Sequence, residues 1–445
     1  MSQAGSEKRI AAISTAAAMA AIGVVRVSGK GSIELLSSIF RPHKNFESHK
    51  MYYGHIVFEG DIIDEVMAAA FYAPKSFTAE DMVEIYAHGG KHVLGRVLEV
   101  VVKSGARLAR PGEFTQRAFL NGRIDLTEAE AVMDIISAKS EAARRAGIKQ
   151  LGGSLTLRIG LLREKLLLWI AHIELSIDYP EHEEEAKNAE EILNEAPKLA
   201  EDLTALLETA SIGRLLKNGV KTAIIGRPNV GKSTLLNFLL SENRAIVHDL
   251  PGTTRDVLSE EVRIGNLPLV IMDTAGIRKS NDAVEMIGIE KTYETAEDAD
   301  LVLYVADATV GLTDEDKEIL NGLTKKTIVL YNKADIADIV PNGLCISAKT
   351  GLGMDKLLKK LEEMFLAGAI SNESTDIITR DRHKHLLEEA LNYLTQAISE
   401  LRMGVHEDLV SISLRLCYTK LGEILGEEIS DDIAEKIFSE FCVGK

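Results

Sequence analysis

The spacing of hydrophobic residues divides the chain into stretches of different character. Residues 1–121 alternate short apolar runs with Gly and Pro turn signals, which predicts a compact α+β domain. Residues 122–217 and 372–445 repeat hydrophobic positions at the helical period. Between them, residues 218–371 alternate short apolar runs with loops and helical stretches, which is typical of a doubly wound, mainly parallel sheet. We therefore predict a multidomain protein in which an α/β domain is inserted into a discontinuous all-α helical domain.

Individual elements follow from the same patterns. In the first stretch we expect strands at Gly23–Val27, Met51–Phe58, Asp64–Ala70 and Met82–Ala87, and helices at Ser32–Ile39 and His92–Lys103. In the α/β stretch we expect strands at Val220–Ile225, Leu269–Met272, Leu301–Ala306, Thr327–Tyr331 and Leu344–Ile346. The segment Leu161–Ile177 carries apolar residues on most faces and contains the single tryptophan, Trp169. This predicts a helix buried among other helices.

An uncharged run near the N-terminus admits two interpretations. Residues 10–25 follow two basic residues and include Ala18-Met19-Ala20, a pattern similar to a secretory leader with its cleavage site. The run is mostly alanine, however, and its end at 22–27 has the composition of a β-strand. We favour the strand.

Composition indicates a globular protein of a reducing compartment. The chain is 46% hydrophobic and 27% charged, which excludes a disordered or collagen-like protein. Its scattered cysteines, Cys345, Cys417 and Cys442, indicate the cytoplasm and argue against a zinc module. The 68 acidic and 51 basic residues leave a net charge of −17, unfavourable for non-specific nucleic-acid binding. Since no other run approaches the ~18 apolar residues of a membrane helix, we expect no membrane partner.

Residues 226–233 carry a phosphate-binding motif. They read Gly-Arg-Pro-Asn-Val-Gly-Lys-Ser and lie between a predicted strand and a predicted helix. Such a loop surrounds phosphates with backbone N–H groups at the start of a helix. We expect Lys232 to contact the β- and γ-phosphates and the Ser233 hydroxyl to bind Mg²⁺.

Further motifs follow in chain order, each after a strand. Residues 273–276, Asp-Thr-Ala-Gly, place a carboxylate near the Mg²⁺ and an N–H group near the γ-phosphate. Residues 332–335 read Asn-Lys-Ala-Asp, in which the Asp335 carboxylate can accept from both N1–H and N2–H₂ of guanine. Residues 347–349, Ser-Ala-Lys, would support the base. The set resembles the nucleotide-binding motifs of GTPases, so we predict GTP rather than ATP.

The catalytic group of this predicted GTPase differs from that of Ras-like proteins. The residue after the Asp-x-x-Gly motif is Ile277, which cannot orient water as a glutamine does. Residues 248–256 are the natural switch segment, with Thr254 as a further Mg²⁺ ligand. Asn229 offers an oxygen beside the phosphates, where a monovalent cation would neutralise developing charge. The predicted nucleotide-binding residues are Asn229, Val230, Gly231, Lys232, Ser233, Thr234, His248, Asp249, Leu250, Pro251, Gly252, Thr253, Thr254, Asp273, Thr274, Ala275, Gly276, Asn332, Lys333, Asp335, Ser347, Ala348 and Lys349.

Two stretches outside the GTPase motifs make the resemblance specific. They are residues 110–126, Arg-Pro-Gly-Glu-Phe-Thr-Gln-Arg-Ala-Phe-Leu-Asn-Gly-Arg-Ile-Asp-Leu, and residues 441–445, Phe-Cys-Val-Gly-Lys. With these, nearly the whole chain resembles the tRNA modification GTPase MnmE (TrmE) family. The resemblance implies a folate-binding, dimerising domain over 1–121, a helical domain over 122–217 and 372–445, and a GTPase (G) domain over 218–371.

The resemblance also implies an activity and its partners. The family hydrolyses GTP in a K⁺-stimulated reaction as its G domains dimerise. With the FAD protein MnmG (GidA), in a heterotetramer, the homodimer installs aminomethyl or carboxymethylaminomethyl groups on C5 of the wobble uridine of certain tRNAs. The alternative from another class is a GTP-dependent assembly or ribosome-binding switch. Such relatives would carry a basic RNA-binding module, and folate binding would distinguish the two.

The resemblance finally assigns roles to residues that match the family motifs. The K⁺ ligands would be Asn229, His248, Leu250 and Thr253, and the catalytic residues Glu285, Asn229 and Lys232. A 5-formyl- or methylene-tetrahydrofolate would be held by Arg26, Glu84, Arg123 and Lys445. Cations suit its glutamyl carboxylates, and a carboxylate suits the N–H donors of the pterin. The chain departs from the family at Ala16–Ala21, which replaces a Pro- and Gly-bearing loop, and at Arg123, where Lys is common.

Overall fold

The protein is described by a computed structural model. It describes residues 8–16, 18–178, 185–242, 260–265, 267–272, 295–338, 341–366, 376–427 and 429–445. The chain forms two compact units, each of which is described by itself. The first comprises residues 1–133, 151–163 and 421–445, and the second comprises residues 134–150 and 164–420.

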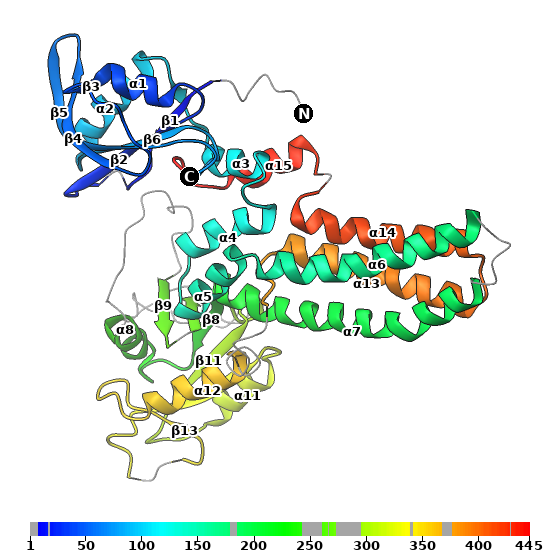
Figure 1. Ribbon diagram of the computed structural model, residues 1–445. Coiled ribbons are helices and arrows are strands. Elements are labelled where there is room, and N and C mark those ends of the chain that lie inside the picture. The colour runs from blue at the N-terminus through cyan, green and yellow to red at the C-terminus, as the bar shows by residue number, and fades with distance from the viewer. Residues whose placement is uncertain are drawn as a thin grey trace. The chain divides into compact units, whose positions relative to one another are not determined.

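The first unit is built on a seven-stranded sheet with the order β3-β4-β5-β6-β2-β1-β7 (Figure 1). The strands are β1 (Ile10–Ile13), β2 (Ile22–Ser28), β3 (Phe40–Arg41), β4 (Met51–Phe58), β5 (Asp61–Phe71), β6 (Met82–His88) and β7 (Arg107–Leu108). Neighbours in this sheet are antiparallel, except that β1 and β7 are parallel. Helices α1 (Ser32–Ile39) and α2 (Lys91–Lys103) pack on one face, against alternate strand residues such as Val25 and Ile85.

The remaining helices of this unit join distant parts of the sequence. They are α3 (Glu113–Leu120), the start of α4 (Leu126–Ile136) and α15 (Asp431–Ser439). Leu126 is fully buried against Phe438 and Phe441. The two stretches that carry the family resemblance, 110–126 and 441–445, therefore belong to one packed region.

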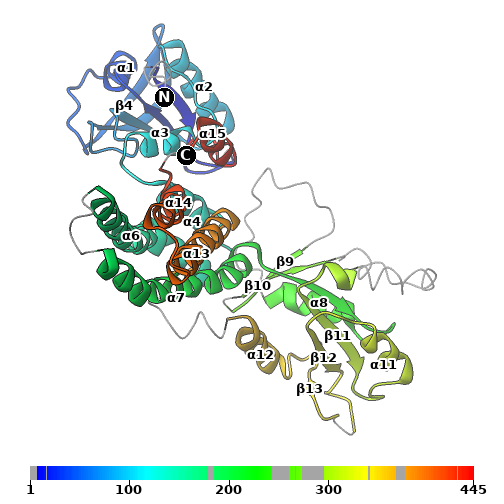
Figure 2. The same ribbon diagram turned by 90° about the vertical axis from the view of Figure 1, so that its right-hand side faces the viewer.

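Helices that lie wholly or mostly in the second unit bring together the chain on either side of the α/β sheet. These helices are α5 (Glu141–Leu151), α6 (Ser154–Asp178), α7 (Glu185–Asn218), α13 (Asp381–Arg402) and α14 (Glu407–Leu425). Helices α7 and α13 lie side by side in both ribbon views (Figures 1 and 2). The Ile378 backbone N–H, just before α13, donates to Thr209 Oγ1 on α7 at 3.1 Å. Asp134 accepts from Arg380 Nη2 at 2.6 Å and from Thr379 Oγ1 at 2.8 Å.

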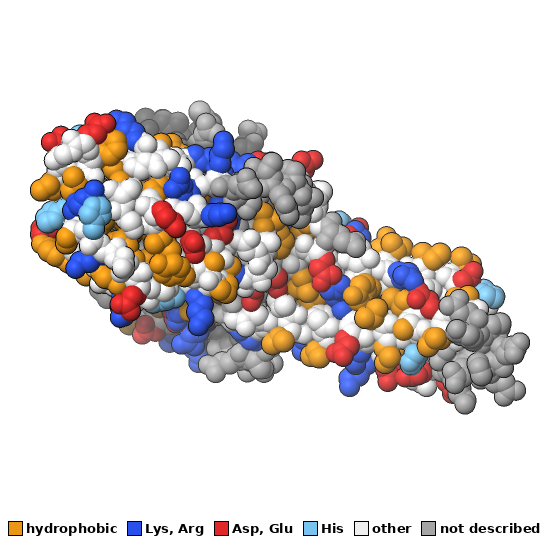
Figure 3. All heavy atoms as spheres, turned by 45° about the horizontal axis from the view of Figure 1, so that its top comes forward, with side chains coloured by type: hydrophobic (Ala, Val, Ile, Leu, Met, Phe, Trp, Pro, Cys, Tyr) orange, Lys and Arg blue, Asp and Glu red, His pale blue; other side chains and the backbone are white. Residues whose placement is uncertain are grey.

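Helix α6 is not buried on all sides, so that expectation is only half right. Trp169 is 1% exposed. Leu161, Leu168 and Leu175, however, are 61%, 51% and 57% exposed. Neighbouring helices cover the face that carries Trp169, while hydrophobic side chains remain visible at the surface of the long helices (Figure 3).

The second unit also holds a six-stranded sheet with the order β13-β12-β11-β8-β10-β9. The strands are β8 (Val220–Ile225), β9 (Glu260–Ile264), β10 (Leu267–Ile271), β11 (Leu301–Asp307), β12 (Thr327–Asn332) and β13 (Leu344–Cys345). All neighbours are parallel except β9 and β10. This confirms the doubly wound, mainly parallel sheet.

Alternate residues of the central strands build a core on each face of this sheet. Leu303 and Val305 of β11 pack in the layer that contains α8 (Lys232–Glu242) and α12 (Met354–Leu366). Val302 and Tyr304 pack in the opposite layer, with α11 (Asp314–Asn321). Since both faces are covered, the strands are apolar throughout, and this made them visible in the sequence.

The predicted strands and the helices of the first unit are confirmed to within a few residues, whereas the helix expected at Leu161–Ile177 begins earlier, at Ser154. The strands that were not predicted have physical reasons. Strand β1 reads Ile-Ala-Ala-Ile and is almost completely buried between β2 and β7, so its small residues give no alternation. Strands β3 and β7 span two residues each. Strand β9 at the sheet edge reads Glu-Glu-Val-Arg-Ile, and its charged residues leave no apolar run. None of the described helices combines the length and the hydropathy needed to cross a membrane.

Candidate functional site

The phosphate-binding motif forms the loop between β8 and α8, and its backbone requires glycine at both ends. Gly226 has φ 151°, and a Cβ there would lie 2.1 Å from the carbonyl oxygen of Val305. Gly231 has φ 98°, and a Cβ there would lie 2.2 Å from Nδ2 of Asn332. Asn229 itself adopts the left-handed conformation, with φ 61°. Gly226 and Gly231 therefore leave no room for a side chain, and a tight glycine turn at the start of a helix is typical of loops whose N–H groups bind phosphate.

Lys232 lies at the first position of α8 and folds back over this loop. Its Nζ donates to the carbonyl oxygens of Gly226 and Arg227, each at 2.7 Å. The ammonium is therefore held at the mouth of the loop, where the motif requires a phosphate-binding cation. Ser233 and Thr234 follow in the first helical turn, where Ser233 is half-buried and Thr234 exposed.

Asn332 joins the phosphate loop to the predicted base-binding segments. It is 3% exposed, and its Nδ2 donates to the carbonyl of Val230 at 2.8 Å. Its Oδ1 accepts from the Ala348 N–H at 2.9 Å. One side chain thus connects three predicted nucleotide-binding segments that are far apart in the sequence.

The residues after Asn332 turn sharply at the end of β12. Lys333 has φ 65°, and its Nζ pairs with Asp307 Oδ2 at 2.7 Å. Asp335 is exposed, as a carboxylate that recognises a ligand must be. The buried Ser347 caps its own turn, because its hydroxyl accepts from the N–H of Thr350. Lys349 is exposed beside it.

Several predicted site residues lie outside the described residues. They are His248, Asp249, Leu250, Pro251, Gly252, Thr253, Thr254, Asp273, Thr274, Ala275, Gly276 and Glu285. Of the predicted metal ligands, Ser233 and Asn229 are described, and their oxygens are of the kind that Mg²⁺ and K⁺ prefer. Among the residues that the structure describes, no group of three or more His, Cys, Asp and Glu side chains is suited to a metal ion.

A second cluster lies on the face of the seven-stranded sheet opposite α1 and α2. Arg26 on β2 and Glu84 on β6 are register partners, and their side chains form a paired contact at 2.8 and 2.9 Å. The hydroxyl of Tyr86 donates to the other oxygen of Glu84 at 2.5 Å. Burial and this hydrogen bond raise the pKa of Tyr86 to about 12. Tyr86 is therefore a neutral donor at neutral pH.

An aromatic ring connects the predicted folate-binding cations. The guanidinium carbons of Arg26 and Arg123 lie 5.0 and 5.1 Å from the ring centroid of Phe77. Arg123 Nη1 also donates to the Phe77 carbonyl at 2.8 Å. The guanidinium carbon of Arg26 also lies 5.7 Å from the ring centroid of Phe114. Cations over aromatic faces give a flat, charged surface, which suits an aromatic anion.

The C-terminal residues complete this cluster. The carbonyl of Gly444 accepts from Arg26 Nη1 at 3.4 Å, and Lys445 is half-buried. Burial, together with the positive charge of Arg26, lowers the pKa of Lys445. The carbonyl of Cys442 accepts from the Gly112 N–H at 3.3 Å, which anchors the C-terminal segment to the start of α3. The structure thus brings Arg26, Glu84, Arg123 and Lys445 together.

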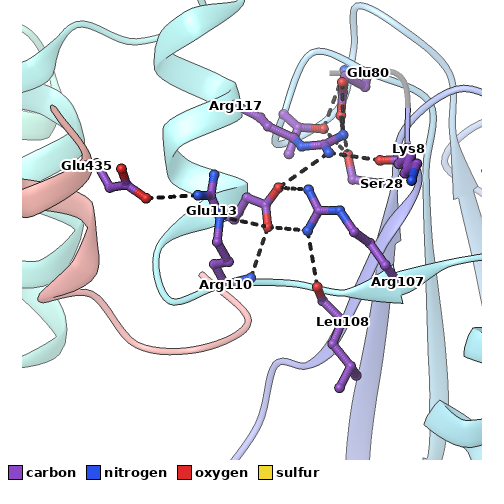
Figure 4. A network of polar contacts seen from close by, with 10 residues as sticks. Lys8, Ser28, Glu80, Arg107, Leu108, Arg110, Glu113, Arg117 and Glu435 are labelled. Carbon is purple, nitrogen blue, oxygen red and sulfur yellow. Dashed lines mark hydrogen bonds and ion pairs between the residues drawn. The ribbon is translucent and has the colours of Figure 1, made fainter. Parts of the chain in front are cut away.

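A network of ion pairs around Arg117 and Glu113 fixes Glu80, three residues after Phe77 (Figure 4). Arg117 on α3 is 5% exposed, and its Nη1 donates to Glu80 at 2.9 and 3.2 Å. Glu80 also accepts from the hydroxyl of Ser28, the last residue of β2. Glu113, 3% exposed, accepts from Arg107 and Arg117, and this network lowers its pKa although burial opposes the charge. The Phe77 loop is therefore held by charge-assisted hydrogen bonds rather than left mobile.

Sequence reasoning missed several residues of both sites. Phe77, Tyr86 and Gly444 in the cluster around Arg26 and Glu84 were not singled out, nor was the role of Asn332 as a connector at the nucleotide site. Only Tyr86 left a usable signal, because it lies two residues from Glu84 on one strand and therefore shares its face.

Comparisons with known proteins cover nearly the whole chain. A family model described as the MnmE helical domain matches residues 126–442, and one described as the GTP-binding protein TrmE N-terminus matches residues 9–123. The chain is 43% identical over 460 residues to the tRNA modification GTPase MnmE of Desulforamulus reducens, covering 98% of this chain and 99% of that one. It is 45% identical over 448 residues to the protein of the same name from Finegoldia magna, with 98% and 99% coverage.

Proposed function

Because the chain belongs to the tRNA modification GTPase MnmE family, we propose that it hydrolyses GTP and acts in tRNA modification. The observation that carries the proposal is the Asn332 contact with Val230 and Ala348. It places a phosphate loop, an Asn-Lys-x-Asp turn and a Ser-Ala-Lys turn at one edge of a parallel sheet. Ligands of such sheets bind at the carboxyl ends of the strands.

We assign the chemistry of hydrolysis to the following residues. The loop backbone and the Lys232 ammonium bind the phosphates, and the Asp335 carboxylate selects guanine through its paired N–H donors. Ser233 and Thr254 would hold Mg²⁺, and Asn229, with switch residues, K⁺. Bound there, these ions supply positive charge to the phosphates. Glu285 would orient the attacking water.

We assign a reduced folate, of the 5-formyl- or methylene-tetrahydrofolate type, to the cluster around Phe77. Its aromatic ring system suits the surface formed by Phe77 and the guanidinium groups of Arg26 and Arg123. Its carboxylates suit Lys445, and the N–H donors of the pterin suit Glu84. The contacts among these residues support the proposal, since a structural role without a ligand would not require two guanidinium groups against one ring.

The finer activity follows from the family. We propose a homodimer that works in the cytoplasm with the FAD protein MnmG to modify C5 of the wobble uridine. We also propose that the G domain, residues 218–371, is an insertion in the helical domain. The packing of α7 beside α13 supports this insertion, because it brings both ends of the inserted segment together.

The proposal is tested with the full-length chain. GTP hydrolysis should exceed ATP hydrolysis, rise in KCl relative to NaCl, and be abolished by Lys232→Ala. Glu285→Ala should lower kcat while GTP affinity stays near the parent value, since an orienting contact is made mainly in the transition state. Equal rates in both salts would refute the cation assignment. Absence of folate binding, with GTP hydrolysis intact, would favour a GTP-dependent switch.

A further inference from the structure

Arg227, the second residue of the phosphate loop, meets a buried carboxylate. Its Nε donates to Oδ1 of Asp316 at 2.9 Å. Asp316 lies in the first turn of α11, and its side chain is 0% exposed, whereas that of Arg227 is 23% exposed. A buried charge without a partner is strongly destabilising, so this contact constrains both residues.

Other donors fix the Asp316 carboxylate itself. The hydroxyl of Tyr304 on β11 donates to Oδ1 at 2.7 Å. The backbone N–H and the hydroxyl of Thr313 donate to Oδ2 at 2.8 and 2.9 Å. Burial opposes ionisation, but these hydrogen bonds and the one from Arg227 lower the pKa of Asp316. The carboxylate is therefore an ionised, fixed anchor at neutral pH.

The anchor reaches the phosphate site through the backbone of Arg227. The carbonyl oxygens of Arg227 and Gly226 are the two that accept from Lys232 Nζ, each at 2.7 Å. A displaced Arg227 would therefore displace both the turn of the loop and the ammonium that lies on it.

We propose that Asp316 and Arg227 are a positioning pair that holds the phosphate loop and Lys232 in their binding geometry. The pair acts through Lys232 and the loop backbone. The inference rests on the proposed nucleotide site. It adds Asp316 to the residues needed for nucleotide binding, although Asp316 lies 89 residues after Arg227 and outside the phosphate-binding motif.

The test is a double-mutant cycle in the full-length protein. Arg227→Met keeps the aliphatic stem, and Asp316→Asn keeps the shape of the side chain. The dissociation constant of a fluorescent GDP analogue should rise about 5- to 20-fold in each single variant. The dissociation constant of the double variant should not exceed that of the single variant that binds GDP less tightly. The kcat at saturating GTP should stay within about twofold, because the loop holds the ground state and the transition state alike. Thermal unfolding confirms that each variant is folded at the assay temperature.

Control variants separate positioning from stability. Lys317→Ala breaks an exposed ion pair with Asp314 on the same helix, at 2.8 Å, and should leave GDP affinity unchanged. Thr313→Ala removes the hydroxyl donor from Asp316 but keeps the backbone N–H donor and leaves Arg227 in place. It should lower the unfolding temperature and change affinity less than Arg227→Met does. If Arg227→Met binds GDP within twofold of the parent, the pair is only structural and the inference is wrong. If the parent chain itself binds no GDP, the proposed nucleotide site fails instead.

Discussion

The side-chain amide of Asn332 donates to the backbone carbonyl of Val230 at 2.8 Å, across 102 residues of sequence. The same side chain accepts from Ala348. The predicted phosphate and base segments are therefore coupled by one buried residue. The consequences of this contact, and of those around Phe77, are open to direct measurement.

Replacing Asn332 should weaken nucleotide binding without direct loss of a phosphate contact. Asn332→Ala leaves a buried carbonyl and a buried N–H without their partner, which costs about 1–3 kcal/mol for each group. We expect at least a tenfold loss of GDP affinity, measured by fluorescence titration, and a lower unfolding temperature. Asn321→Ala, at the exposed end of α11, is the matched control and should match the parent in both. Parent-like GDP affinity in Asn332→Ala would contradict the coupling.

Adding a single methyl group at Gly231 should abolish GTP binding. The new Cβ would lie 2.2 Å from Asn332 Nδ2, so either the loop or Asn332 must move. Gly311→Ala is the control, because Gly311 has φ 75° in the same sheet domain but meets nothing within 4 Å. It should cost only about 1 kcal/mol of backbone strain. Equal effects of both substitutions on GTP affinity would show that backbone strain alone, and not the contact with Asn332, is responsible.

Phe77→Leu should weaken folate binding about three- to thirtyfold, because leucine keeps the apolar volume but loses the aromatic face. Calorimetry with 5-formyl-tetrahydrofolate measures the effect. Phe58→Leu is the matched control. It removes a similar ring, whose centroid lies 5.9 Å from Nζ of Lys103. If both variants bind folate like the parent, the Phe77 cluster is not the folate site.

The pH dependence of folate binding should report on Lys445. Its pKa is lowered from the usual 10.5 by burial and by Arg26, so the free protein loses this proton at a lower pH than an exposed lysine does. A bound carboxylate favours the charged form. Affinity should therefore fall as the pH rises from about 7.5 towards about 10, with proton uptake on binding. Lys445→Met should bind folate more weakly at neutral pH, and its folate affinity should not fall over this pH range. An identical pH profile in both proteins would exclude Lys445 from the site.

Asp134→Asn should loosen the junction between α4 and the segment before α13. It removes the charge that pairs with Arg380, whose side chain is 15% exposed, and leaves Thr379 a weaker acceptor. We expect the free energy of unfolding to fall by about 2–4 kcal/mol, because the largely buried Arg380 guanidinium loses its charged partner. Proteolysis near residues 376–380 should become faster in the variant. Asp381→Asn, at an exposed neighbouring position, should cost less than about 1 kcal/mol.

The sequence alone determined the class of each domain and the local shape of the phosphate loop. Strand and helix periods are properties of consecutive residues, and the positive φ angles of Gly226 and Gly231 belong to the turn that the motif itself encodes. Strands that are covered on both faces, such as β11, are visible as nearly continuous apolar runs.

Only the tertiary structure decided which distant residues meet. Asn332 with Val230, Asp316 with Arg227, and Phe77 with Arg26 and Arg123 are contacts between segments with no shared period. Strand order and helix packing set these contacts, and a periodic pattern carries no information about which element becomes a neighbour. The short buried strand β1 was not predicted for a related reason. Its alanines carry no strand pattern of their own, and pairing with β2 and β7 makes the segment a strand.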